Sequence, residues 1–217
     1  DSYFNESHFK HLRRWSGQRR NDADAQQTQA YQELKQAYEV TSRWADGVQE
    51  ALFPDGFMVV RKRPTNQANN FAGYNWARIY PAENADKMLA YTVGIDANRG
   101  FVVKIDTVNL DDRNDVRRRY FALRDQPDTN IVATLSEEEG LRKTLVELIA
   151  WSIEAIKGFS MTYEQVQHAL GLSANPEDEI VLERFDGKPA FRDFRKQWTA
   201  EQSSLFCRLV RSVHDAG

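Results

Sequence analysis

Two runs, 88–96 and 101–108, constrain the fold more than any other part of the chain. In both runs large apolar side chains alternate with smaller or polar ones, which is the period of a half-buried β-strand. The alternating residues are Leu89, Tyr91, Val93 and Ile95, followed by Phe101, Val103 and Ile105. Between the runs, Ala97-Asn-Arg-Gly100 supplies the residue types that adopt positive φ in tight turns. The pattern predicts an antiparallel hairpin.

A long helix is expected before this hairpin. From about residue 25 to residue 52, apolar and aromatic side chains recur every three or four positions, as on one face of a helix. Shorter apolar runs at 57–63 and 76–80 each stop at a proline, and 131–135 is a further candidate strand. We therefore predict an α+β fold, with a small, mainly antiparallel sheet of about four strands packed against a long N-terminal helix.

Helical patterns dominate the last third of the chain. Ser or Thr followed three positions later by Glu or Gln predicts three helix starts by capping boxes. These pairs are Ser136 with Glu139, Thr162 with Gln165, and Thr199 with Gln202. The polar stretch 175–188 contains a proline and a glycine and is a candidate linker. We predict a recognition domain at 1–135 and a helical region at 136–217, either separate or packed on the first.

The composition indicates a folded protein without membrane spans. The chain has 217 residues, 12% of them aromatic, and no run approaches the roughly 18 apolar residues that a span requires. Cys207 is the single cysteine, which excludes an internal disulfide and, with no signal peptide, favours the cytoplasm. The first residue is Asp1 and a helical pattern continues into the last residues, so we expect a piece of a longer, multidomain protein.

Charge is distributed unevenly along the chain. The net charge of −3 does not mark a nucleic-acid-binding protein. Residues 1–81 carry 11 Lys and Arg against 9 Asp and Glu, whereas the remainder carries 18 against 23. Any surface that binds nucleic acid is therefore expected in the first half of the chain, as a local patch.

The stretch Arg61–Trp76 combines cations, side-chain amides and aromatic rings outside any regular period. Cations hold phosphates, amides read the hydrogen-bonding edges of bases, and rings stack on bases. This composition favours a loop that binds nucleic acid; the alternative is a polar connection whose rings turn into the core. The candidate residues are Arg61, Lys62, Arg63, Asn66, Gln67, Asn69, Asn70, Tyr74 and Trp76, with Phe71 and Asn75 in the same stretch.

Two other basic segments offer phosphate contacts. An amphipathic helical pattern at 4–15 is followed by Arg19 and Arg20, and Arg117–Arg119 lies late in a predicted helix at 111–123. The alternative for the first segment is a solvated helix face. For the second it is a favourable interaction of the arginines with the helix dipole.

Catalytic signatures are missing from the sequence. The histidines are scattered, and neither a Gly-rich phosphate loop nor a Gly-x-Ser-x-Gly elbow occurs. The nearest arrangement is Asp96, Lys104 and Asp106 on the predicted hairpin, because metal-dependent nucleases place two acids and a lysine on a sheet. Val102 stands where those enzymes usually carry an acid, so a salt bridge between Lys104 and Asp106 is the structural alternative. We expect no catalytic residue, metal or cofactor.

Two segments carry a family likeness: 69–79, Asn-Asn-Phe-Ala-Gly-Tyr-Asn-Trp-Ala-Arg-Ile, and 90–95, Ala-Tyr-Thr-Val-Gly-Ile. They resemble the N-terminal DNA-recognition region of McrB-type, modification-dependent restriction proteins. The likeness covers roughly residues 30–125, although Phe-Ala-Gly-Tyr-Asn differs from the family's double-glycine form. The resemblance implies a DNA-reading domain that precedes a GTP-hydrolysing AAA+ motor, and no motor motif occurs in this sequence.

Three hypotheses follow. The first is a non-catalytic module that binds double-stranded DNA and senses modified bases, from a prokaryotic restriction or anti-phage defence protein. Arg61–Arg63 would hold phosphates, while the amides and rings of the same stretch would read and stack on a base, including one flipped from the duplex. The second is a protein-interaction or oligomerisation module whose C-terminal helices dock another domain, a partner subunit or a second copy. The third is the metal-dependent nuclease described above.

Overall fold

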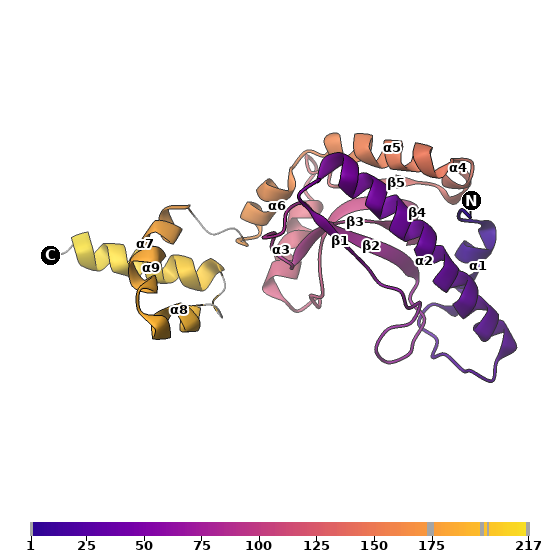
Figure 1. The fold of residues 1–217 in the computed structure, drawn as a ribbon, viewed down its shortest axis with the longest axis horizontal. Coiled ribbons are helices and arrows are strands. Elements are labelled where there is room, and N and C mark those ends of the chain that lie inside the picture. Colours follow the sequence, from indigo (N-terminus) through magenta and orange to yellow (C-terminus); the bar gives the residue numbers. More distant parts are fainter. Residues whose placement is uncertain (1, 173–175, 196–197, 199, 216–217) are drawn as a thin grey trace.

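The computed structural model describes residues 2–172, 176–195, 198 and 200–215. Within these residues the centre is a five-stranded antiparallel sheet, in which each strand pairs with the next along the chain (Figure 1). The strands are β1 (Phe57–Val60), β2 (Tyr74–Tyr80), β3 (Leu89–Asp96), β4 (Gly100–Thr107) and β5 (Val132–Leu135). The predicted hairpin is β3–β4, and Gly100 at its turn has a φ of +80°. The α+β prediction is confirmed, with five strands rather than about four.

The long helix α2 (Ala25–Leu52) packs along one face of this sheet (Figure 1). It begins at Asp24, whose carboxylate accepts the backbone N–H groups of Gln26 and Gln27 and so satisfies the first turn. Its buried stripe includes Leu34, Ala37, Val40, Trp44 and Val48, all with almost no exposed surface. The bounds agree with the periodicity that predicted the helix.

Strand alternation divides β2 into two sets of side chains. Asn75, Ala77 and Ile79 are buried toward α2. The Asn75 amide donates from Nδ2 to the Leu34 carbonyl at 3.1 Å, and its Oδ1 accepts from the Thr41 hydroxyl at 2.7 Å. The intervening set, Tyr74, Trp76 and Arg78, is half-buried and lies on the opposite face of the sheet.

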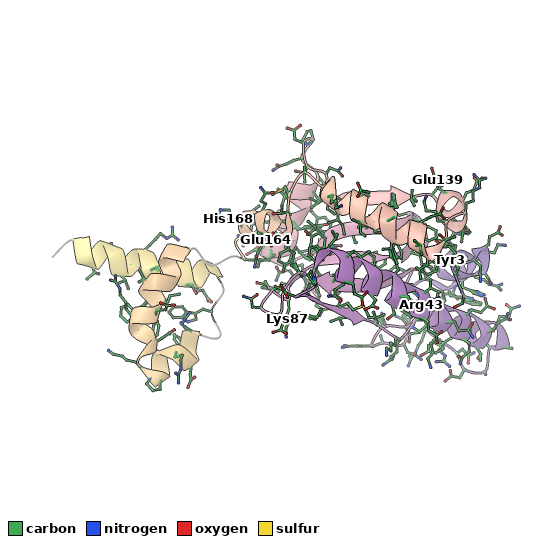
Figure 2. All side chains as sticks on the ribbon, turned by 45° about the horizontal axis from the view of Figure 1, so that its top comes forward. Tyr3, Arg43, Lys87, Glu139, Glu164 and His168 are labelled. Carbon is green, nitrogen blue, oxygen red and sulfur yellow. The ribbon has the colours of Figure 1, made fainter. Side chains whose placement is uncertain are left out.

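Further helices complete the layer on the α2 side. α1 (Glu6–Trp15) and α5 (Leu145–Lys157) both pack against α2. Trp44 Nε1 donates to Ser152 Oγ of α5 at 2.8 Å, which satisfies a fully buried indole. Before α1, the Tyr3 hydroxyl donates to the carbonyl of Gly140 at 2.9 Å, and Figure 2 shows Tyr3 beside that part of the fold.

Capping boxes begin three helices that follow β5. The predicted boxes at Ser136 and Thr162 are present and start α4 (Glu137–Leu141) and α6 (Tyr163–Ala169). A box that we did not predict, at Thr144, starts α5. Asn114 caps α3 (Asp115–Arg124), which packs at β4. The predicted box at Thr199 lies outside the described residues.

The last three helices form a small cluster of their own. They are α7 (Pro176–Asp186), α8 (Pro189–Arg195) and α9 (Ala200–Asp215), gathered around Val181, Leu182 and Cys207 (Figure 1). The prediction of a linker at 175–188 is wrong, because α7 occupies most of it and Pro176 is its first residue, where a missing N–H does no harm. Since α5 and α6 pack on α2 and the sheet, the packing divides after α6 rather than at residue 135.

None of the helices among the described residues is long and apolar enough to cross a membrane.

Candidate nucleic-acid interface

Aromatic and charged side chains gather on the sheet face opposite α2. The Tyr74 and Trp76 rings stack, with centroids 4.2 Å apart and planes inclined by 25°. The Trp76 indole lies across Gly94 of β3, where any Cβ would overlap it, and Nζ of Lys104 on β4 lies 3.6 Å from the indole centroid. Glycine at position 94 therefore allows one ring to reach from β2 to β4.

A buried group of charges adjoins this indole. Asp106 forms two ion pairs: its Oδ2 lies 2.5 Å from Lys104 Nζ, and its Oδ1 lies 2.5 Å from NH1 of Arg117 on α3. Only 5% of the Lys104 side chain and 9% of the Asp106 side chain are exposed. Burial lowers the pKa of Lys104, and the Asp106 carboxylate opposes that shift. The salt bridge proposed as the structural alternative to a nuclease site is confirmed.

A cavity of about 150 Å³, the inner cavity, opens beside this group. Its walls include Tyr38, which comes from α2, together with side chains from β2, from the end of β4 and from the segment after β1. The Tyr38 hydroxyl and Trp76 Nε1 are both buried without a hydrogen-bond partner. Burial raises the pKa of Tyr38, although the charge of Arg61 opposes the shift, so the hydroxyl stays protonated. The lining residues that matter below are Tyr38, Arg61, Trp76, Arg78, Asp106 and Asn109.

A larger and more open cavity of about 710 Å³, the outer cavity, adjoins the inner one. The two share Arg61, Arg78 and Asn109 in their walls. Arg63, Asn66 and Gln67 from the predicted loop also line the outer cavity. Cations and amides of the loop therefore line a cavity that adjoins the one beside the aromatic stack.

The cations around these cavities lack acidic partners. Within the residues that the structure describes, no carboxylate forms an ion pair with Arg61, Lys62, Arg63 or Arg78. The Arg61 guanidinium donates to the Thr65 carbonyl at 2.7 Å and makes no other hydrogen bond there. Several other arginines of the described residues do pair with a carboxylate, as Arg117 and Arg124 do. This local excess of positive charge is unusual for a chain that is acidic overall.

Lys62 points into a different space. It lines a third cavity of about 410 Å³ on the α2 side of β1, together with Lys35, Arg43 and Tyr38. Tyr38 therefore stands in the walls of both the inner and the third cavity. Basic side chains flank β1 on both sides.

The predicted basic segment at Arg19 and Arg20 meets the loop through the backbone. The backbones of Arg19 and Asn70 form an isolated antiparallel β-bridge, and the Arg20 N–H donates to the Asn69 carbonyl at 2.8 Å. Arg20 is already engaged, since it pairs with Asp22 at 2.7 Å and its guanidinium lies 3.7 Å from the Tyr31 ring centroid. The structure thus brings both predicted segments together but leaves Arg19 as the exposed cation of the pair.

Several amides of the stretch serve the fold. Asn69 has a φ of +61°, and the Asn66 side chain accepts the N–H of Asn70 at 3.0 Å, so these residues shape the turn. Asn75 and Phe71 are buried in the core, as the alternative reading of the loop expected for its rings. Gln67 remains exposed on the rim of the outer cavity.

Sequence reasoning missed three residues of the site, Tyr38, Arg78 and Asn109. Arg78 had a usable signal, because strand alternation places it on the same face as Tyr74 and Trp76. Asn109, which has a φ of +56°, and Tyr38 are far from the loop in sequence, and only the tertiary fold brings them to it.

The nuclease arrangement does not assemble. Asp96 accepts the N–H groups of Asn98 and Arg99 at the hairpin turn, whereas Asp106 lies near the other end of the same hairpin. Among the described residues, no three His, Cys, Asp or Glu side chains gather as metal ligands.

A second polar cluster, Ser7, His11 and Glu33, joins α1 to α2. Glu33 Oε2 lies 2.7 Å from Ser7 Oγ and 2.8 Å from His11 Nε2. The Ser7 hydroxyl also meets that same nitrogen at 3.3 Å. A relay would need the serine and the acid on different imidazole nitrogens, so this cluster has a structural role.

Comparison of the chain with protein-family models, with curated proteins and with solved structures finds no match.

Proposed function

We propose that this chain is a non-catalytic DNA-recognition module of a cytoplasmic protein that acts in prokaryotic restriction or anti-phage defence. The observation that supports this most is the set of cations without carboxylate partners around the two cavities, beside an aromatic stack. Unpaired arginines at one concave surface favour a polyanionic partner, because phosphates would supply the missing negative charge.

Each part of the surface has a distinct role in this proposal. Arg61, Arg63 and Arg78 contact phosphates of double-stranded DNA and set its position. Gln67 and Asn109 are exposed amides at the same cavity and can read base edges. Since Tyr74 and Lys104 already lie against the Trp76 ring, Tyr74 is the ring that a base, flipped or unpaired, would meet.

Sensitivity to base modification belongs to the same proposal. A modified base differs from its parent by one small group, so discrimination needs a contact that closes around the base. The outer cavity, at about 710 Å³, is large enough to admit a base. The resemblance to McrB-type recognition regions supports this reading.

The salt dependence of binding tests the proposal. If Arg61, Arg63 and Arg78 each neutralise one phosphate, log Kd against log salt for duplex DNA should have a slope of about 3, since each contact contributes about 0.9. Fluorescence anisotropy with unmodified and cytosine-modified duplexes would measure it. In Arg63→Ala the slope should fall by about 0.9 for every DNA sequence alike.

A matched control separates this effect from a change in net charge. Arg142 and Lys157 are exposed, pair with Glu138 and Glu154, and lie on or beside helices away from the cavities. The double variant Arg142→Ala/Lys157→Ala should keep the wild-type slope. Equal losses in the control and in Arg61→Ala/Arg63→Ala would show that the cavities do not direct binding, and the absence of binding at low salt would remove the proposal.

An exposed apolar stripe on α9 favours the second candidate, an oligomerisation or protein-interaction module. Leu205, Leu209 and Val213 are 52%, 58% and 75% exposed and recur every four residues on one helix face. Analytical ultracentrifugation of the wild type and of Leu209→Asp would test it, with concentration-dependent association expected only in the wild type. Association unaffected by Leu209→Asp would contradict it.

A further inference from the structure

In the wall of the inner cavity, the side chains that can only donate hydrogen bonds outnumber the one that can only accept them. Arg61, Arg78 and Trp76 Nε1 can only donate, and the Tyr38 hydroxyl has a proton to give. The one carboxylate in the wall, Asp106, is already occupied on both oxygens by Lys104, Arg117 and the Thr107 N–H. A ligand that complements this wall must therefore bring acceptors.

Two of these donors are buried without a partner. Tyr38 is 3% exposed, and neither its hydroxyl nor Trp76 Nε1 bonds to any other atom of the protein. Most buried polar groups in proteins are paired, so each exception needs an explanation. A bound ligand with acceptor atoms would give both groups the partners that the free protein lacks.

The charges nearby select an anion. Arg61 and Arg78 line the cavity without a carboxylate partner, and the one carboxylate of the wall, Asp106, is already shared by Lys104 and Arg117, so positive charge is in excess. An uncharged acceptor would leave this excess unbalanced in a partly buried space. A phosphate group carries enough oxygens and charge to meet several donors at once.

We infer that the inner cavity binds a phosphate monoester, such as the terminal phosphate of a DNA strand or the phosphate of a free nucleotide. The inference rests on the proposed function for its nucleic-acid context. A phosphodiester continues in both directions and suits the open outer cavity, whereas the inner cavity is smaller and more enclosed and so suits the end of a chain. The two adjoining cavities would then hold the body and the end of one strand.

Entry requires a small rearrangement. The Tyr38 hydroxyl and Trp76 Nε1 have no surface that water can reach. Arg61 lies close enough to Tyr38 to affect its pKa and is held by one hydrogen bond, to the Thr65 carbonyl. Rotation of this long side chain toward an incoming phosphate is the movement that we expect to open the wall.

Binding of matched ligands with and without a terminal phosphate tests the inference on the full chain. Short duplexes of one sequence, with either 5′-phosphate or 5′-hydroxyl ends, should differ in Kd by about tenfold or more, the value of one charge-assisted hydrogen bond. A nucleoside monophosphate should compete, and the nucleoside should not. Stronger binding of the duplex end would identify strand termini as the source of the phosphate, and stronger binding of the mononucleotide would identify a free nucleotide; both support the site.

Variants locate the effect. Tyr38→Phe removes only the unpartnered hydroxyl, so it should fold as well as the wild type. It should nevertheless reduce the preference for phosphorylated ends to about threefold or less. Gln67→Ala, at the outer cavity, should keep the full preference.

The outcomes distinguish this inference from the proposed function. Salt-dependent binding of a closed circular duplex with no preference for phosphorylated ends, and no competition by the monophosphate, would overturn the inference and leave the DNA-binding proposal standing. Competition between a nucleoside monophosphate and inorganic phosphate at the site, with no binding of circular DNA, would support the inference and overturn the DNA-binding proposal. A full phosphate preference in Tyr38→Phe would place the phosphate elsewhere and also overturn the inference.

Discussion

Replacing Asp106 by Asn should destabilise the sheet strongly. The substitution keeps the size of the side chain and an acceptor oxygen, but it leaves Lys104 and Arg117 side by side without their shared counter-charge. The Lys104 and Asp106 side chains are 5% and 9% exposed, so water cannot replace the carboxylate. Removing one partner of such a buried pair costs about 3–5 kcal/mol, a large share of the roughly 5–15 kcal/mol that holds a domain folded.

The pH dependence of this loss has a defined sign. The carboxylate of Asp106 opposes the lowering of the Lys104 pKa, so its removal should lower that pKa further. A lysine whose pKa is lower in the folded than in the unfolded state destabilises the fold below that folded value. The destabilisation disappears as pH rises through the folded pKa toward about 10.4, the value in the unfolded chain. The loss of stability caused by Asp106→Asn should therefore be largest near pH 7 and should shrink under alkaline conditions.

Urea unfolding followed by tryptophan fluorescence would measure the effect. The background should be Trp198→Phe, because Trp198 belongs to the separate C-terminal cluster and the other four tryptophans report on the sheet and its helices. The double variant Lys104→Met/Asp106→Asn removes both charges and should recover much of the stability. Comparing it with the two single variants gives the interaction energy between the two side chains. A loss below about 1 kcal/mol in Asp106→Asn would show that the pair is solvated and would refute this reasoning.

Two further predictions concern packing and pH. Gly94→Ala should lower the free energy of unfolding, measured in urea, by about 1–3 kcal/mol and should weaken DNA binding, because the added Cβ would overlap the Asn75 carbonyl and the Trp76 indole. Unchanged stability would mean that the indole moves away freely. Glu33 has a pKa lowered to about 2, chiefly by the Ser7 hydroxyl, so its stabilising effect should be complete above about pH 4.5 and lost as pH falls toward 2. The difference in Tm between the wild type and Glu33→Gln should shrink over this range in circular-dichroism melts, and a constant difference would contradict the assigned contacts.

Periodicity was sufficient to predict most of the regular structure. The bounds of α2 were predicted correctly because one apolar stripe of the helix is buried along its length. Those of β3 and β4 were predicted to within a residue, because both faces of these strands are buried. The stretch 175–188 was interpreted wrongly because Pro176 and Gly187 signal a break in sequence, yet both fit at the ends of a helix.

The candidate site was harder to predict than the fold. Composition drew attention to the loop, and Arg61, Arg63, Gln67, Tyr74 and Trp76 do line the two cavities. Composition cannot distinguish an amide that faces a ligand from one that completes a turn. Asn66 completes a turn, because its side chain accepts the N–H of Asn70. Nor can it reveal a wall residue supplied by a distant helix, because that depends on how the helix lies on the sheet.

The buried amide of Asn75 decides how α2 lies. Apolar side chains repeat along this helix every three or four residues, so hydrophobic contact alone would tolerate a slide of one turn, about 5.4 Å, along the sheet. Such a slide would separate Asn75 from the Leu34 carbonyl and the Thr41 hydroxyl. The Asn75 amide would then be buried in the core without a hydrogen-bond partner, which is unfavourable. The two hydrogen bonds of this amide thus fix the position of α2 along the sheet. Since Tyr38 lies one turn before Thr41 on α2, the same hydrogen bonds determine which side chain of the helix reaches the cavity on the far side of the sheet.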